Sequence, residues 1–165
     1  MQIRGETAAD EEEISSLITA AFLEAEHSGG NEAQIVQTLR VAECLTLSLV
    51  ACENERIVGH IAFSPVTIDG RSDGWFGLGP VAVAPQRQGL GIGSALIRAG
   101  LASLREQGAR GCVVLGDPAY YVRFGFAADP HLRLAEVPPD YFQRLSFDEQ
   151  PSMGMVEYHS AFAAD

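Results

Sequence analysis

Residues 75–107 constrain the fold more than any other part of the sequence. The segment starts with the largely apolar run WFGLGPVAVAP, which predicts a buried, central strand that ends at Pro85. The next stretch, QRQGLGIGS at 86–94, places glycine at three alternate positions. Apolar residues then recur at helical spacing, and Gly108 stands where a glycine commonly ends a helix. This order predicts a strand, a glycine-rich turn and a helix within one layered unit.

The segments on either side alternate between strand and helix patterns. The run ISSLITAAF is apolar along one helical face, and Asn31 is a candidate N-cap for a second, short helix. TLSLVACE and RIVGHIAFSPV, separated by two residues, predict a hairpin. The later expected elements are a polar turn at DGRSDG, a buried strand at GCVVLG, a short helix at DPAYY, a strand opening at 125–126, a short helix or covering loop at YFQRLSF, and a final strand at GMVEYHSAF. No linker or repeat divides the chain, so we expect an α/β structure in a single domain over residues 1–165.

The composition limits the classes of ligand. The chain has 11 lysines and arginines against 22 acidic residues, a net charge of −11, so we expect no nucleic acid partner, which would need clustered basic residues. No apolar run approaches the roughly 20 residues that span a bilayer, so we expect no membrane partner. The acidic start MQIRGETAADEEE is unlike a signal peptide, which predicts a cytoplasmic location. The three cysteines and four histidines lack metal-binding spacing, and the acidic surface suits either a cationic substrate or solubility alone.

The glycine stretch is suited to an anion. The first turn of a helix has free N–H groups, and glycine lets a phosphate approach the backbone. A P-loop requires a lysine that this stretch lacks. A dinucleotide-binding turn follows the first strand and has a glycine or alanine at its third position. Here that position is Ser94, and the pattern comes about eighty residues into the chain. Neither nucleotide class fits, and a helix start whose glycines serve tight packing remains an alternative.

Two spaced motifs resemble those of the GNAT superfamily of N-acetyltransferases. Gln86-x-x-Gly89-x-Gly91 is similar to its acetyl-CoA pyrophosphate loop, and YVRFGF at 121–126 is similar to its Y-x-x-x-G-F segment. The order of predicted elements over residues 2–127 agrees, and GDPAYYVRFGF and VEYHSAF resemble a bacterial branch of the superfamily. The resemblance implies an α/β (α+β) fold with a central mixed, mostly antiparallel sheet of six to seven strands flanked by helices. In that fold the strand at 78–84 splays from the parallel strand at 111–116 and the gap holds acetyl-CoA.

The resemblance also implies how the donor is held. The backbone of Val81 and Val83 would pair with the pantetheine amides, and the Val81 amide would polarise the thioester carbonyl. The side chains of Leu90 and Ile92 would pack the loop down, and Arg87 is either a phosphate contact or a solvated side chain. The pyrophosphate would rest on the backbone N–H groups of Gln88, Gly89, Leu90, Gly91, Ile92, Gly93 and Ser94.

Tyr121 is the general acid that the resemblance implies. In the family an amine attacks acetyl-CoA directly in a ternary complex, and the leaving thiolate needs a proton. A tyrosine has an ordinary pKa of about 10, so it is protonated at neutral pH and can supply that proton. No metal takes part in this chemistry.

The acceptor side is less defined by the sequence. The acceptor is expected to be a primary amine, on a small molecule or on a protein lysine or N-terminus. Glu32 at the start of the second helix, and His60 and Ser64 on one strand face, are acceptor-pocket candidates. A helix-terminal charge and a polar sheet face are the structural alternatives, and no general base is assigned. We expect a monomer or homodimer, and a non-catalytic acyl-CoA-binding sensor is the alternative function.

Overall fold

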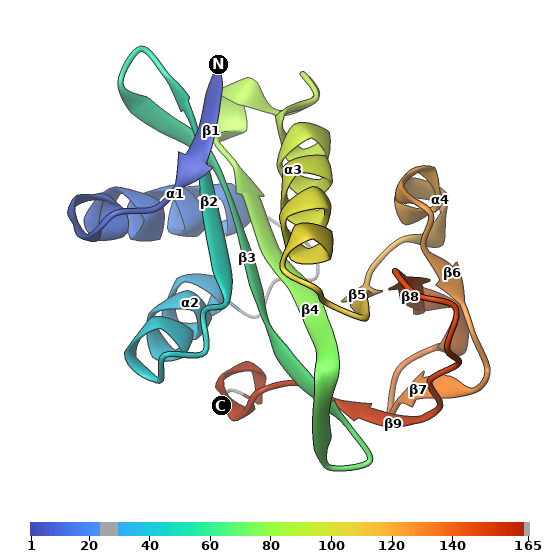
Figure 1. Cartoon of the computed structure of the whole chain (residues 1–165). Coiled ribbons are helices and arrows are strands. Elements are labelled where there is room, and N and C mark those ends of the chain that lie inside the picture. The colour runs from blue at the N-terminus through green and yellow to red at the C-terminus, as the bar shows by residue number, and fades with distance from the viewer. Residues whose placement is uncertain (24–29, 164–165) are drawn as a thin grey trace.

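A computed structural model describes residues 1–23 and 30–163 of the chain. The described residues form a mixed sheet of nine strands, seven of which follow the order β1-β2-β3-β4-β5-β8-β6 (Figure 1). Strands β4 and β5 run parallel, as do β7 and β9, and the other neighbours are antiparallel. The expected fold class is confirmed, with two short strands off the main path. The bounds are β1 (Gln2–Gly5), β2 (Leu47–Glu53), β3 (Arg56–Ile68), β4 (Arg71–Val83), β5 (Gly111–Leu115), β6 (Ala127–Ala128), β7 (Leu132–Leu134), β8 (Phe142–Ser146) and β9 (Gly154–Glu157).

Helices cover both faces of the long strands. Figure 1 shows α1 (Glu11–Phe22) and α2 (Glu32–Val41) on one side of β2–β4, and α3 (Ile92–Glu106) on the other. Ile14, Leu17 and Ile18 of α1 are buried in a cluster with Val50 and Ala62 of the sheet, whereas the buried face of α3 packs on a second cluster. The second cluster contains Ile61, Phe63, Leu78, Ile92, Leu96, Ile97, Leu101, Leu104 and Cys112. The helices predicted by apolar periodicity are confirmed, and none in the described ranges is long and apolar enough to cross a membrane.

Two tight turns align the three long strands. Asn54 and Glu55 link β2 to β3 with φ values of 50° and 65°, and Asp69 and Gly70 link β3 to β4 with 49° and 81°. Positive φ at both central residues is typical of the two-residue turn whose twist matches the flanking strands. The second turn is shorter than the polar turn predicted at 69–74, because Arg71 already begins β4.

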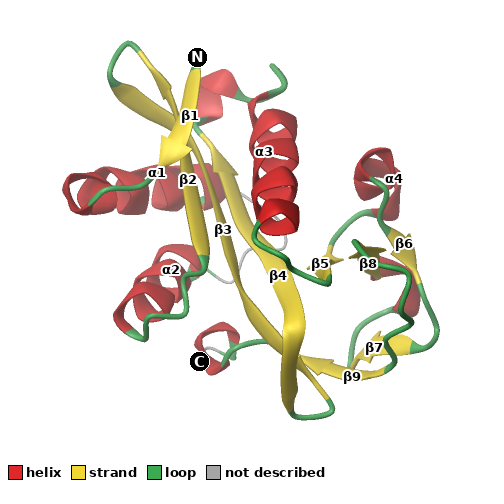
Figure 2. Cartoon of the chain, viewed as in Figure 1, coloured by secondary structure: helices red, strands yellow, loops and turns green. Residues whose placement is uncertain are grey.

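Strand β4 pairs with β5 over only part of its length. The register joins Trp75–Gly77 to Gly111–Val113, and no further pairs of β4 with β5 are formed in the described chain. Further along, the β3–β4 register shifts, so that Ala62 faces both Gly79 and Pro80. An extra residue of this kind bends and twists a strand. The second half of β4 therefore stays with β3 and leaves β5, as Figure 2 shows.

One predicted element is wrong. Residues 142–146, within YFQRLSF, form strand β8 instead of a short helix or covering loop. They pair antiparallel with β5 along its other edge, from Leu115↔Phe142 to Gly111↔Ser146. The buried Gln143 side chain donates to the carbonyl oxygen of Gly116 over 3.1 Å. The mixed polar and apolar pattern is compatible with several elements, and pairing with a distant strand decides between them.

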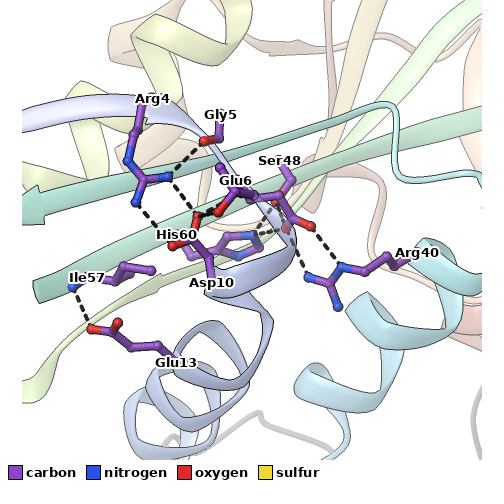
Figure 3. Close-up of polar contacts among 10 residues, drawn as sticks. Arg4, Gly5, Glu6, Asp10, Glu13, Arg40, Ser48, Ile57 and His60 are labelled. Carbon is purple, nitrogen blue, oxygen red and sulfur yellow. Dashed lines mark hydrogen bonds and ion pairs between the residues drawn. The ribbon is translucent and has the colours of Figure 1, made fainter.

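A buried polar network joins the N-terminal strands to α2 (Figure 3). Arg40 of α2 donates two hydrogen bonds to the Glu6 carboxylate, at 2.8 and 2.9 Å, and Ser48 donates a further one. The Ser48 hydroxyl also lies 2.7 Å from Nε2 of His60, a fully buried side chain on β3. Burial opposes ionisation of Glu6, but the hydrogen bonds from Arg40 and Ser48 outweigh it and hold its pKa below the ordinary value. The network thus ties α2 to three neighbouring strands.

The buried imidazole predicts a loss of stability in acid. Burial lowers the pKa of His60 from 6.5 to about 4, an effect that the nearby Glu6 charge opposes and the Arg40 charge supports. Between those pH values the unfolded chain binds a proton that the folded chain does not, so the free energy of unfolding falls as the pH falls. Complete loss of this contribution amounts to about 3 kcal/mol.

Urea unfolding at pH 7.5 and near pH 4 measures this loss. We expect His60→Gln to show a smaller difference between the two pH values than the natural chain, since glutamine does not titrate. His131→Gln, a change at an exposed histidine, is the matched control and should keep the full difference. An equal difference in all three proteins would contradict the assignment to His60.

Candidate active site

The outward backbone groups of β4 form one wall of the candidate site. The N–H of Ala84 donates to the carbonyl oxygen of Val58 on β3 over 2.8 Å. Because alternate residues of an antiparallel strand bond to the same neighbour, Val81 and Val83 direct their N–H and C=O groups away from β3. They point to the side that β5 has left, and there the Val83 carbonyl accepts a hydrogen bond from the Gln88 side chain over 3.1 Å.

An open cavity of about 640 Å³ lies against this wall. Its lining comes from the end of α1, from β4 and from the turn that follows β4. The lining residues are Ala20, Ala21, Phe22, Leu23, Val81, Ala82, Val83, Pro85 and Gln88. The cavity is therefore bounded by strand backbone on one side and by a mostly apolar helix end on the other.

The glycine stretch forms a turn that exposes backbone to solvent. Gly89 and Gly91 have φ values of 79° and 87°, in the left-handed region that favours glycine, and a Cβ at either would meet no atom within 4 Å. Helix α3 begins at Ile92, and its first backward bond runs from the Ala95 N–H to the Gly91 carbonyl at 3.0 Å. The N–H groups of 92–94 consequently have no partner within the described chain and face an open cradle suited to an anion.

The side chains of this turn divide into packed and exposed ones. Ile92, the first residue of α3, is buried as predicted, but Leu90 is 68% exposed and does not pack the loop down. Leu90 lies between two left-handed glycines at the tip of the turn, which carries its side chain away from the core. Arg87, for which phosphate binding and solvation were both open, forms an ion pair of 2.9 Å with Glu53.

Two adjacent tyrosines of α4 (Pro118–Tyr121) take different positions beside the cradle. Asp117 caps this short helix through a 2.9 Å hydrogen bond from the Ala119 N–H. The Tyr120 hydroxyl lies 3.2 Å from the Ser94 hydroxyl at the start of α3. Tyr121 instead packs its ring against Gly116, where a Cβ would overlap the ring, and against Phe126 with ring centroids 5.9 Å apart. Burial raises the pKa of Tyr121 to about 12, and the nearby Tyr120 and Cys112 add to the shift, so its hydroxyl stays protonated at neutral pH.

The three acceptor-pocket candidates do not come together at the cavity. Glu32 is half-buried in the first turn of α2 and takes part in at least one polar or electrostatic interaction. His60 and Ser64 are fully buried, and His60 belongs to the polar network that holds α2. Its Nδ1 atom and the Ser64 hydroxyl have no hydrogen-bond partner among the described residues. All three stay predictions as acceptor contacts, and the described residues contain no cluster of side chains suited to a metal ion.

The sequence did not single out Tyr158 as a site residue. It follows β9 within the VEYHSAF segment, and its ring lies over Gly77, the last residue of β4 that pairs with β5. The branch resemblance of VEYHSAF was a signal for this segment, but nothing local in the sequence connects it to β4.

Comparison with known proteins assigns the family. The model of the acetyltransferase (GNAT) family matches residues 12–126. The uncharacterized N-acetyltransferase YhbS of Escherichia coli K12 is 39% identical over 169 residues, which cover 98% of both chains.

Two solved structures agree with this assignment along the whole chain. A GNAT family acetyltransferase from Brucella melitensis in complex with acetyl-CoA is 52% identical, covers 98% of this chain and 97% of its own, and has a TM-score of 0.88. YhbS from Escherichia coli in complex with CoA is 36% identical, covers 99% of this chain and 92% of its own, and has a TM-score of 0.91. Together with the divergent β4–β5 pair and the cradle at α3, these matches show that the chain belongs to the GNAT family of acetyltransferases.

Proposed function

We propose that the protein transfers the acetyl group of acetyl-CoA to a primary amine by direct attack in a ternary complex. The observation that carries the proposal is the juxtaposition of two backbone surfaces. The unpaired edge of β4 at Val81 and Val83 lies next to the exposed N–H groups at the start of α3. A strand edge suits an amide-containing chain such as pantetheine, and a helix start suits its pyrophosphate.

Donor binding on these surfaces uses mainly backbone atoms. The N–H groups from Gln88 to Ser94 hold the pyrophosphate, and the Val81 N–H donates to the thioester carbonyl. The Val83 carbonyl pairs with a pantetheine amide, which requires the Gln88 side chain to give up its present hydrogen bond to that carbonyl. The complexes of the Brucella protein with acetyl-CoA and of YhbS with CoA support this choice of donor.

The chemistry is an acyl transfer between two bound substrates. The amine nitrogen forms a bond to the acetyl carbon, the carbon–sulfur bond breaks, and its electron pair leaves on sulfur. Tyr121 donates its proton to this thiolate, a role that its protonated state at neutral pH allows. The proton that the amine loses passes to water or to a base that no described residue identifies.

The acceptor is a small-molecule amine or a protein lysine or N-terminus. The net charge of −11 favours a cationic compound through long-range attraction, and it disfavours nucleic acid. A cytoplasmic location, the absence of a membrane partner, and a monomeric or homodimeric state remain predictions.

Changing Gly91 tests the donor site. Acetyl-CoA at about 100 times its Kd should stabilise the folded chain by about 2.7 kcal/mol, because it binds only the native state. Gly91→Val places a branched side chain at the cradle, in a backbone conformation that valine disfavours, and should abolish this stabilisation. Thermal unfolding at several acetyl-CoA concentrations measures both effects.

The matched control lies at the other end of the same helix. Gly108→Val introduces the same side chain at a φ of 88° and also in open space, so it should lower the melting temperature similarly but keep the acetyl-CoA response. A normal response of Gly91→Val would place the pyrophosphate elsewhere.

Changing Tyr121 tests the general acid. Tyr121→Phe keeps the ring that packs on Gly116 and removes the hydroxyl, so acetyl-CoA should bind with unchanged affinity. We expect kcat to fall by about 100-fold, the usual range for a lost acid. Thiol release with an amine panel measures turnover, and Tyr141→Phe, at a half-exposed tyrosine, is the control. Unchanged turnover would exclude Tyr121 from proton transfer, whereas acetyl-CoA binding without turnover in the natural chain would favour the sensor.

A further inference from the structure

The C-terminal segment brings a second tyrosine to the point where β4 and β5 separate. Tyr158 follows β9, which pairs with the end of β3, next to the turn of the β3–β4 hairpin, through Ile68↔Val156. A Cβ on Gly77 would overlap Cε1 of Tyr158, so the ring lies directly on the strand backbone. Gly77 is paired with Val113, and the pairing of β4 with β5 ends at this position.

The two tyrosines occupy opposite faces of the sheet at this gap. Tyr121 packs with the cluster beneath α3, and Gly116 at the end of β5 makes room for its ring. Tyr158 packs with Val66 and Val113 in a separate cluster. Gly77 faces Ser64 across the β3–β4 pair, and Ser64 shares its strand face with Ala62 of the cluster beneath α1. Tyr158 therefore lies on the face that carries α1 and α2.

Aromatic contacts hold both tyrosine rings in place. Tyr158 meets Phe142 edge to face, with ring centroids 6.5 Å apart, and lies 5.3 Å from Phe162 of the turn η5 (Ser160–Phe162). Neither tyrosine hydroxyl forms a hydrogen bond to the described part of the chain. Each hydroxyl can therefore still form a hydrogen bond to a bound molecule.

Burial keeps both tyrosine side chains in their neutral form. Burial raises the pKa of Tyr158, and the charges of Cys112 and Tyr121 raise it further. Cys112 acts on Tyr121 in the same way. Both phenols remain protonated at neutral pH.

We propose that Tyr158 binds the acceptor, its hydroxyl accepting a hydrogen bond from the amine on the face of the sheet opposite Tyr121. The proposal rests on the proposed acetyl transfer, in which the thioester occupies the gap between β4 and β5. Tyr121 then serves the leaving sulfur from the α3 side, and Tyr158 holds the attacking nitrogen on the α1–α2 side. The attacking nitrogen and the leaving sulfur thus lie toward opposite faces of the sheet, with the acetyl carbon between them.

A conservative substitution separates this role from packing. Tyr158→Phe keeps the ring contacts with Gly77 and Phe142 and removes only the hydroxyl. With spermidine and a lysine-containing peptide as acceptors, kcat/KM for the amine should fall by about 3- to 10-fold, the range of one hydrogen bond. The KM for acetyl-CoA and the melting temperature should stay unchanged. Tyr141→Phe, at a half-exposed tyrosine, is the control and should alter neither parameter.

The position itself has a test that needs no turnover. In a crystal structure with acetyl-CoA, the Tyr158 hydroxyl should lie within about 6 Å of the acetyl carbon, a span that one amine nitrogen or water bridges. A larger separation would overturn the proposal, and so would unchanged amine kinetics in Tyr158→Phe. The proposed function still holds in either case if acetyl-CoA stabilises the natural chain and the natural chain acetylates spermidine or the peptide. If the natural chain neither responds to acetyl-CoA nor acetylates an amine, the proposed function itself is rejected.

Discussion

The end of pairing between β4 and β5 is the constraint on which the rest of the molecule depends. In a sheet interior, a strand satisfies its backbone groups on both sides, and an unpaired buried group costs free energy. After Gly77, β4 bonds to β3 alone, so Val81 and Val83 direct polar groups toward a side that has no strand. The Gln88 side chain satisfies one of them at present. The fold therefore maintains an edge within the body of the sheet, at a place where a ligand can complete it.

The surrounding elements hold this edge open. The bulge at Gly79 and Pro80 turns β4 with β3, while β8 pairs with the far edge of β5 and keeps that strand in the other half of the sheet. On the α1–α2 face, the network of Glu6, Arg40 and His60 fixes α2 against the N-terminal strands. Pairing and packing on each side thus hold the two strands apart.

The sequence predicts those parts of this arrangement whose signals are local. The apolar run before Pro85, the glycines at 89 and 91 and the periodicity of α3 predict strand, turn and helix because each depends on neighbouring residues. Strand β8 was missed because its identity depends on pairing with β5, far away in the chain. His60 and Ser64 were correctly placed on one strand face, but the alternation of a strand does not reveal what covers that face. Tyr158 could not be connected with Gly77 for the same reason, since only tertiary packing brings them together.

The exposed turn between β4 and α3 determines which sequence changes the protein can tolerate during evolution. Its available contacts are peptide N–H groups, which are present whatever the side chains are, so most substitutions there preserve the hydrogen-bond donors. The exceptions are Gly89 and Gly91, whose left-handed conformation restricts the choice of residue. Most substitutions in this turn should therefore leave anion binding intact. Substitutions on the α1–α2 face of the sheet can change the choice of acceptor without altering the turn. In the proposed function, the main chain recognises the donor, and side chains that are free to change recognise the acceptor.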